Sequence, residues 1–368
     1  MKYGLVYYKY TDNLGDDILS YAAKQFLPNI DYYIDRESMD IFVPNEDEAV
    51  AVILNGWFLH IFQSFPPSPF IKPLFIGTHF RKDENLFHDY SYLESKTAKN
   101  FLKKYEPIGC RDRNTNEVLN KIGIQSYFSG CLTLTLKPFS DIENNHKIIL
   151  TDVPKEIETY VKCLLPEKDI ITQTHLIPDE KRGASWQSRE QCLEEHLKLY
   201  QGADLVITTR LHCALPSIAL GTKTILISKY DEDWKKRISD FAEYCTMFSA
   251  QDILDKKADR LLLFPELIEN EGIKKLQEKI SETCKDFIRN VKNNSEDNLP
   301  NRDDYIKYYV ERTEYLRRSN FKFYQVCSEI SSEYERVGNA LVHSKSIIDR
   351  LLQENENLNK LIAKLNKN

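Results

Sequence analysis

Residues 204–228, DLVITTRLHCALPSIALGTKTILIS, decide the fold. The stretch is typical of a buried strand, a tight turn, a short helix and a second buried strand. A proline is tolerated only in the first turn of a helix, so Pro216 predicts that this helix begins close to His212. Gly221 suits the left-handed position that follows a helix. We therefore predict that Arg210 and His212 lie at the carboxyl end of a parallel strand, beside the N–H groups of a helix start.

This turn is a candidate anion site. Open α/β sheets bind ligands at the carboxyl ends of their strands, and helix starts favour negative charge. The planar fork of Arg210 suits a phosphate or carboxylate, and His212 can transfer a proton near neutral pH. Alternatively, Arg210 pairs with a nearby carboxylate and His212 is a satisfied core histidine. We favour the functional interpretation because both residues share one turn.

The strand-then-helix pattern recurs on both sides of this stretch. Strands are predicted at residues 2–8, 49–54, 73–77, 107–110, 125–128, 146–151, 169–172, 204–208 and 223–228, and helices at 155–164, at 189–201 and through Ile18, Leu19, Ala22, Phe26 and Leu27. Such alternation indicates an α/β protein with mostly parallel sheets. Residues 137–145 are polar and rich in helix breakers. We therefore predict two Rossmann-like domains that face a cleft, residues 1–138 and residues 139–292.

Residues 293–368 differ and are predicted as a polar linker followed by a helical tail. Seven-residue spacing relates Ile348, Asn355 and Ile362, and likewise Leu351, Leu358 and Leu365. These residues fit the a and d positions of a short coiled coil, in which an asparagine at position a favours a parallel dimer. A single amphipathic helix docked on its own domain fits the same pattern, and both alternatives stay open.

The overall composition bounds the class of protein. The 368 residues are 42% hydrophobic, which supports a sizeable core, and their net charge of −6 argues against a nucleic-acid partner. The start is too short and polar for a signal peptide, and no run approaches the ~18 apolar residues of a membrane-spanning helix. The eight cysteines show no C-x-x-C pair, which indicates reduced thiols without a zinc site. We expect a cytoplasmic protein, with peripheral attachment to the inner membrane face left open.

A second motif, Asn13-Leu14-Gly15-Asp16-Asp17, follows the first predicted strand. Gly15 permits close approach of a ligand to the backbone, but the motif is not the G-x-G-x-x-G pattern of a dinucleotide site. Asp16 or Asp17 either caps the next helix or orients and deprotonates an acceptor hydroxyl. Both interpretations stay open.

Further candidates also end strands or lie in loops. Arg111 and Asp112 form either a structural ion pair, which we favour, or a ligand contact. His175 follows a strand, and Arg182 and Arg189 flank a Gly/Ser loop that either closes over an anion or is simply solvated. The segments Asn55-Gly56-Trp57 and Gly77-Thr78-His79 end strands in the first predicted domain. No metal-ligand spacing is present.

Four of these segments occur in an order that resembles the polysaccharide pyruvyl transferase family. They are Asn13-x-Gly15-Asp16, Arg111-Asp112-x-x-Thr115, the SGCLTL run at residues 129–134, and Thr209-Arg210-Leu211-His212 followed by Gly221. The resemblance covers roughly residues 1–230 and none of the chain beyond about residue 295. The chain departs from the family at Asn55-Gly56-Trp57, where the family usually has a Gly-rich run. That departure concerns the acceptor more than the donor.

The resemblance implies a fold similar to GT-B glycosyltransferases and transfer of the enolpyruvyl unit of phosphoenolpyruvate onto two hydroxyls of a sugar. The products are a cyclic ketal and phosphate, and the donor is a substrate, so no cofactor is expected. The resemblance places the acceptor in residues 1–138 and the donor in residues 139–292. Arg210 would hold the donor's phosphate or carboxylate, and His212 would transfer a proton. Altogether we predict Arg210, His212 and Asp16 as catalytic, and Asn13, Gly15, Asp17, Arg111, Asp112, His175 and Arg182 as substrate-binding.

Partners and alternatives follow from this hypothesis. The expected acceptor is a sugar of a surface or capsular glycan, or its lipid-linked precursor, and the tail is a candidate for homodimer formation. A glycosyltransferase using a nucleotide sugar shares the implied fold and an Arg-rich diphosphate site. A non-catalytic scaffold of a glycan pathway is the other alternative, although it has no need of Arg210 and His212.

Overall fold

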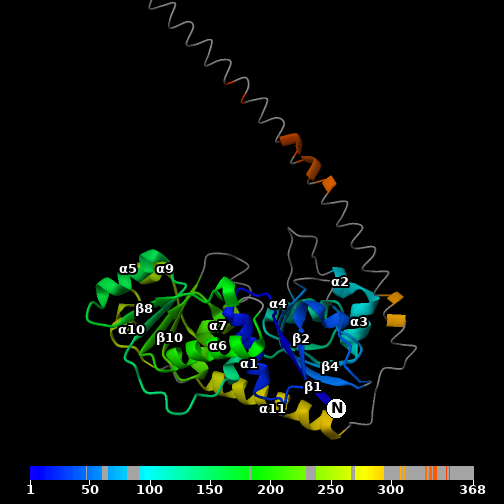
Figure 1. The fold of residues 1–368 in the computed structure, drawn as a ribbon. Coiled ribbons are helices and arrows are strands. Elements are labelled where there is room, and N and C mark those ends of the chain that lie inside the picture. The colour runs from blue at the N-terminus through cyan, green and yellow to red at the C-terminus, as the bar shows by residue number, and fades with distance from the viewer. Residues whose placement is uncertain are drawn as a thin grey trace, which may run out of the picture. The chain divides into compact units, whose positions relative to one another are not determined.

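The protein contains two parallel sheets, seen in the computed structural model of Figure 1. The structure describes residues 1–46, 48–59, 65–80, 91–181, 184–228, 238–266 and 270–293, with single positions and short runs between 307 and 348. Contacts group Met1–Asn301 as one compact unit and Arg302–Asn368 as another. Both sheets belong to the first unit.

The first sheet has six parallel strands in the order β2-β1-β3-β4-β5-β6. They are β1 (Lys2–Tyr7), β2 (Tyr32–Asp35), β3 (Val50–Phe58), β4 (Ile71–Phe80), β5 (Ile108–Cys110) and β6 (Ser126–Phe128). One face packs against α1 (Leu14–Lys24) and the 3₁₀ turn η3 (Leu132–Thr135). The other face packs against α3 (Lys96–Lys103) and α4 (Arg113–Lys121), near the short α2 (Ser91–Glu94). The 3₁₀ segment η1 (Arg36–Ile41) follows β2.

The second sheet has five parallel strands in the order β11-β10-β9-β7-β8. They are β7 (Ile148–Thr151), β8 (Ile170–Gln173), β9 (Leu205–Thr208), β10 (Thr224–Ser228) and β11 (Thr246–Ser249). One face packs against α5 (Lys155–Leu164), α9 (Ala250–Leu254) and α10 (Asp259–Leu263), and the other against α6 (Trp186–Gln201) and α7 (Leu211–Ala219). The short 3₁₀ turns η4 (Asp179–Lys181) and η5 (Ser239–Phe241) lie in loops.

Helix α1 joins the two sheets, because it contacts β1 and β3 of the first sheet and α6 and α7 of the second. Figure 1 shows these three helices between the sheets, and one apolar cluster runs through them from Leu5 to Leu226. The predicted α/β class with parallel sheets is confirmed. The edge strands β2 and β11 were not predicted, because their short sequences carry little apolar periodicity.

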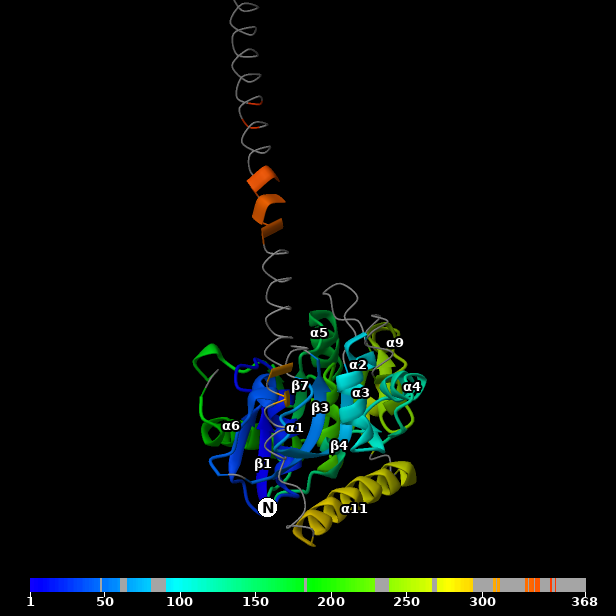
Figure 2. The ribbon, with the colours of Figure 1, turned by 90° about the vertical axis from the view of Figure 1, so that its right-hand side faces the viewer.

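The sheets separate between β6 and β7, in the stretch that contains residues 137–145. The last helix, α11 (Glu271–Asn293), however, returns to the first sheet, which was not expected for the end of the second domain. Ile288 packs with Tyr3 and Ala51, and the Gln277 side chain donates to the Leu134 carbonyl at 2.8 Å. Figures 1 and 2 both show α11 running along one edge of the unit.

Helix α7 begins at Leu211, with Arg210 as its N-cap residue, close to where the sequence placed it. The prediction that Pro216 lies in the first turn of this helix is wrong, however, since Pro216 is the sixth residue of α7. A proline there removes one helical hydrogen bond, which the buried surroundings of Leu215 and Pro216 tolerate. Gly221 has φ of 87°, the left-handed conformation expected after the helix.

A buried ion pair connects the helices on which the two sheets meet. Arg189 in α6 donates from Nε to Asp17 in α1 at 3.0 Å, and its Nη2 contacts the other carboxylate oxygen. Its Nη1 donates to the Tyr8 carbonyl at 2.7 Å. At the edge of this interface, the Tyr21 hydroxyl donates to Glu194 at 2.9 Å.

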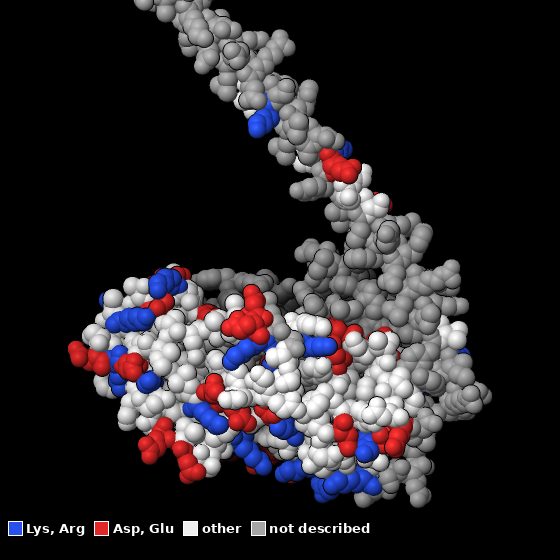
Figure 3. Space-filling model, viewed as in Figure 1, with Lys and Arg blue, Asp and Glu red and all other residues white. Residues whose placement is uncertain are grey.

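The second unit is helical at its described positions between residues 307 and 348, where Val310, Val337 and Ile348 are exposed. The other predicted heptad positions, from Leu351 to Leu365, lie outside the described residues, so the coiled coil remains a prediction. None of the described helices is long and apolar enough to span a membrane. On the face in Figure 3, acidic and basic side chains of the described residues are interspersed.

We predict that Asp17→Ala destabilises the protein by about 3–5 kcal/mol, because it leaves the Arg189 guanidinium charged and buried without its partner. Urea unfolding measures this loss. Arg289→Ala is the control, since the exposed Arg289–Asp286 pair should contribute within about 0.5 kcal/mol. Equal stabilities of the two variants would show that the buried pair does not hold the interface.

Candidate active site

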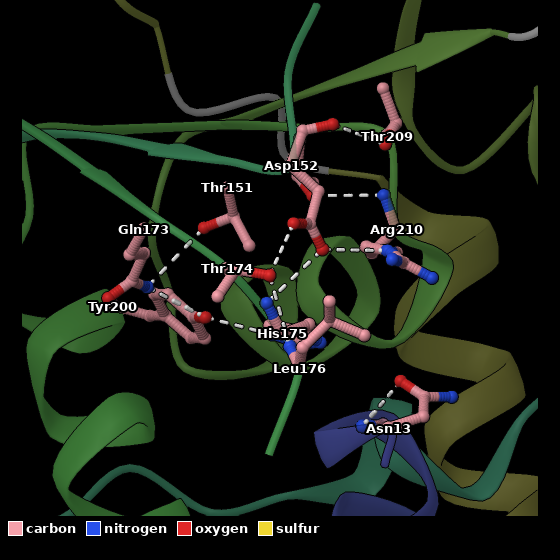
Figure 4. A network of polar contacts seen from close by, with 12 residues as sticks. Asn13, Thr151, Asp152, Gln173, Thr174, His175, Leu176, Tyr200, Thr209 and Arg210 are labelled. Carbon is pink, nitrogen blue, oxygen red and sulfur yellow. Dashed lines mark hydrogen bonds and ion pairs between the residues drawn. The ribbon is translucent and has the colours of Figure 1, made fainter. Parts of the chain in front are cut away.

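Arg210 is fixed by the carboxylate of Asp152, a partner that the sequence did not predict. Its Nε donates to Asp152 Oδ2 at 2.7 Å, and the side chain remains 36% exposed (Figure 4). The alternative that Arg210 pairs with a carboxylate is thus correct for Nε. The pair does not use the terminal nitrogens, which make no hydrogen bond with the described residues. Asp152 therefore holds the Arg210 guanidinium in one orientation through Nε and leaves its two terminal nitrogens available.

Asp152 connects the ends of three neighbouring strands. It follows β7, its carboxylate accepts from Thr174 Oγ1 at 2.7 Å and from the His175 amide at 3.1 Å, and its carbonyl accepts from Thr209 Oγ1 at 2.7 Å. Burial would raise the pKa of Asp152, but these hydrogen bonds and Arg210 hold it below its ordinary value. The residue has φ of 51°, which aspartate tolerates better than most residues. An aspartate directly after a predicted strand was the available sequence signal.

His175 is held inside the second sheet's layer and is 1% exposed. Its Nε2 lies 2.8 Å from the Tyr200 hydroxyl, to which the Gln173 amide also donates at 2.9 Å. Burial lowers the pKa of His175 to about 3, so the ring is neutral at physiological pH. The side chain is therefore a fixed neutral group beneath Asp152 and Arg210.

The backbone around His175 also connects the two sheets. The Leu14 amide donates to the His175 carbonyl at 2.8 Å, and the Ile177 amide donates to the Asp12 carbonyl at 2.7 Å. Asn13 and Leu176 form an antiparallel bridge between these hydrogen bonds. The loop before α1 is thereby paired with the loop after β8.

The two strongest sequence motifs touch each other. A Cβ atom placed on Gly15 would lie 3.0 Å from Cβ and 3.2 Å from Nδ1 of His212, so a larger residue would push the histidine away. Asn13 caps α1 by accepting from the Gly15 amide at 3.1 Å, so neither Asp16 nor Asp17 is the cap. Residues some 200 positions apart thus form one surface at the start of α1 and the start of α7.

The two aspartates after Gly15 face different surroundings. Asp17 forms the buried ion pair with Arg189 at the interface between the sheets, and its substrate-binding role stays a prediction. Asp16 is 3% exposed and accepts from Thr11 Oγ1 at 2.6 Å and, more weakly, from Trp57 Nε1 at 3.4 Å. Burial raises the pKa of Asp16 against the opposing charges of Arg36 and Arg111. A carboxylate whose pKa is raised is a stronger base than an exposed aspartate.

Arg111 and Asp112 do not form the expected ion pair. Asp112 contacts His79 Nδ1 at 2.6 Å and caps α4 by accepting from the Thr115 amide at 2.8 Å. Burial would raise the pKa of Asp112, but His79 and the other contacts hold it low. Arg111 is 5% exposed, and its Nε has no hydrogen-bond partner among the described residues. Asp112 therefore pairs with His79 and not with Arg111, and the ligand contact of Arg111 stays a prediction.

Other predictions concern residues beyond this cluster. Arg182 lies outside the described residues. Within the described part of the chain, no group of histidine, cysteine and acidic side chains could hold a metal ion. The cysteines described there are all free.

Comparison with known proteins identifies the family. A model for polysaccharide pyruvyl transferases matches residues 13–229, more than half of the chain. The chain belongs to the polysaccharide pyruvyl transferase family. The matched region begins at the Asn13 cap and ends after β10, so it contains both motifs that meet at Gly15 and His212. No curated protein matches the chain.

Several solved structures are similar at low identity. A UDP-N-acetylglucosamine 2-epimerase has 12% identity and a TM-score of 0.44, with 82% of this chain and 98% of that chain covered. S. aureus MnaA in complex with UDP has 12% identity, a TM-score of 0.40 and coverages of 85% and 98%. An uncharacterized protein from Klebsiella pneumoniae subsp. pneumoniae NTUH-K2044 has 11% identity and a TM-score of 0.40. The match covers 68% of this chain and 93% of that chain.

We predict that neutral His175 makes this transferase family member sensitive to acid. Its folded pKa of about 3 lies below the ~6.5 of an exposed histidine, so at intermediate pH the unfolded chain binds the extra proton. Stability is complete above about pH 6.5 and falls as the pH drops toward 3. Between about pH 6 and 4, His175→Gln should lower the slope of unfolding free energy against pH by about 1.4 kcal/mol per unit. Urea unfolding at several pH values measures it.

Arg289→Gln serves as the control for this measurement, because the Arg289 side chain is 68% exposed. It should leave the wild-type slope unchanged. A slope that stays the same in His175→Gln would mean that His175 is not the buried neutral histidine described above.

Proposed function

We propose that the protein transfers the pyruvyl unit of phosphoenolpyruvate onto two hydroxyls of a sugar, forming a cyclic ketal and releasing phosphate. The observation that carries the proposal is the contact between Gly15 and His212, which places an acidic loop and a basic turn at one surface. The family membership supports pyruvyl transfer. We further propose that the acceptor belongs to a surface or capsular glycan or its lipid-linked precursor, reached from the cytoplasm or the inner membrane face.

The cations of the site suit the donor. Phosphoenolpyruvate carries up to three negative charges on one phosphate and one carboxylate. Arg210 offers terminal nitrogens held in place by Asp152, and Arg111 is a buried guanidinium that does not pair with its neighbour Asp112. Charge-assisted hydrogen bonds to such anions are stronger than neutral ones, and the start of α7 adds backbone N–H groups. Arg210 and Arg111 therefore bind the two anionic groups of the donor.

The proton transfers can be assigned to His212 and Asp16. His212 in its protonated form protonates C3 of the enol, which generates an oxocarbenium-like centre at C2. One sugar hydroxyl attacks C2, the bond from C2 to the phosphate oxygen breaks, and the second hydroxyl closes the ring. The two hydroxyl protons are lost: one replaces the proton delivered to C3, and the other ends on phosphate. Asp16, with its raised pKa, accepts a hydroxyl proton at the acceptor side.

We predict that phosphoenolpyruvate raises the melting temperature, whereas UDP-sugars do not, because the site suits a small trianion. In the presence of acceptor, His212→Gln should lower the rate of phosphate release by about 10²–10⁴-fold without loss of folding. Arg210→Gln should instead weaken stabilisation by phosphoenolpyruvate. The exposed Arg289→Gln variant is the control for both.

Two outcomes would contradict this proposal. Stabilisation by UDP-sugars with none by phosphoenolpyruvate would assign the chain to the nucleotide-sugar glycosyltransferases instead. Unchanged phosphate release by His212→Gln would remove the histidine from the proton transfer.

We also propose that the tail forms a homodimer. Light scattering after size exclusion should give a dimer mass for the full chain and a monomer mass for residues 1–301, because the heptad positions lie beyond residue 301. Leu351→Glu with Leu358→Glu in the full chain should have the same effect as truncation. The same mass for all three proteins would mean that the helix does not pair.

A further inference from the structure

The loop between β1 and α1 fixes the position of Thr11. The Thr11 amide donates to the Tyr8 carbonyl at 3.2 Å, and the same carbonyl accepts from Nη1 of Arg189 at 2.7 Å. Two residues further along the chain, the Asn13 amide donates to Thr11 Oγ1 at 3.1 Å. Thr11 is therefore held at both its amide and its hydroxyl oxygen, next to the arginine that joins the two sheets.

This arrangement directs the hydroxyl proton of Thr11 toward Asp16. Thr11 Oγ1 donates to Asp16 Oδ2 at 2.6 Å, a length typical of a hydroxyl bound to an ionised carboxylate. The backbone amide of Asn13 can only donate, so Thr11 Oγ1 is the acceptor in that contact and its own proton is directed elsewhere. An ionised carboxylate can only accept. The bond from Thr11 is therefore strongest when Asp16 carries its charge.

The second hydrogen bond of Asp16 has the same direction. The indole Nε1 of Trp57, which can only donate, lies 3.4 Å from Asp16 Oδ1 and makes the longer and weaker contact. A carboxylate offers about four lone-pair sites, so two donors leave acceptor capacity for a substrate hydroxyl. Thr11 is thus the closer of two donors that stabilise the ionised form.

The charges around Asp16 act in both directions. Burial raises the pKa of Asp16, while Arg36, the hydrogen bonds from Thr11 and Trp57, and Arg111 oppose the increase. The other titratable groups near it are Tyr8 directly after β1, Asp17 in the same turn of α1, and His212 of α7, which lies against Gly15. Because Thr11 is neutral, its hydroxyl can be removed without changing the charge of the site.

We propose that Thr11 is a positioning residue that keeps Asp16 ionised and oriented, so that Asp16 can accept a proton from the acceptor hydroxyl. The inference rests on the proposed function, in which Asp16 is the base. A base must be ionised before it can accept a proton. Without the Thr11 hydroxyl, burial would keep Asp16 protonated up to a higher pH, and the transferase would lose its base over that range.

The pH dependence of kcat/KM for the acceptor tests this role. Thr11→Val keeps the size of the side chain and removes the donor, so the acidic limb of the profile should move to higher pH by about 1–2 units. Thr11→Ala should move it in the same direction, and Thr11→Ser, which keeps the hydroxyl, should restore the wild-type limb. Thr159→Val is the matched control, because its exposed hydroxyl donates only to the Lys155 carbonyl within α5. This variant should leave the profile unchanged.

Direct titration of Asp16 separates this inference from the proposed function. In the full chain labelled with ¹³C at the aspartate carboxyl carbons, the signal that disappears in Asp16→Asn belongs to Asp16. Without any substrate, this signal should titrate at higher pH in Thr11→Val and Thr11→Ala than in the wild type and Thr11→Ser. If phosphoenolpyruvate is not turned over, the proposed function fails, and the titration still decides whether Thr11 keeps Asp16 ionised.

Two outcomes count against Thr11. An Asp16 signal that titrates at the same pH in the wild type, Thr11→Val and Thr11→Ala would overturn the inference. So would a shifted titration combined with an unmoved acidic limb in an active enzyme, since the hydrogen bond would then have no part in the reaction.

Discussion

The Asp17–Arg189 ion pair constrains the distance between the two sheets at the site. Asp17 lies in the first turn of α1, directly after Gly15 and Asp16, and Arg189 comes from the layer of the second sheet. Any movement of one sheet against the other must therefore carry or break a buried pair, and it also changes how closely Gly15 approaches His212. The backbone hydrogen bonds between residues 12–14 and 175–177 add a second restraint close by.

Neighbouring residues hold each charged side chain of the site in a fixed orientation. Arg210 uses one nitrogen for Asp152, Asp16 uses one oxygen for Thr11, and Asp112 is occupied by His79 and the helix cap. In each case a neighbour fixes the side chain, and for Arg210 the remaining atoms face outward. Such preorganisation reduces the cost of ordering charged groups when a substrate binds.

Local sequence patterns predicted the elements that are continuous along the chain. The β9–α7–β10 stretch could be recognised because its apolar runs, turn and final glycine are contiguous, and Arg210 and His212 were located for the same reason. Partnerships across the fold were not predictable. Nothing near Asp17 indicates that Arg189 binds it, and Asp152 has no local feature that links it to Arg210. The expected Arg111–Asp112 pair illustrates the same limit, since a better partner, His79, arrives from another strand.

The return of α11 to the first sheet has a consequence for synthesis of the chain. Tyr3 and Ala51 emerge from the ribosome early, yet Ile288, which covers them, emerges after the whole second sheet. Gly130 likewise waits for Leu276, whose side chain fills the space beside it. The first sheet therefore cannot complete its own apolar layer when its last strand has been made. This apolar surface of the first sheet stays uncovered until nearly 300 residues have been made. The first domain therefore cannot finish folding before the second has been synthesised.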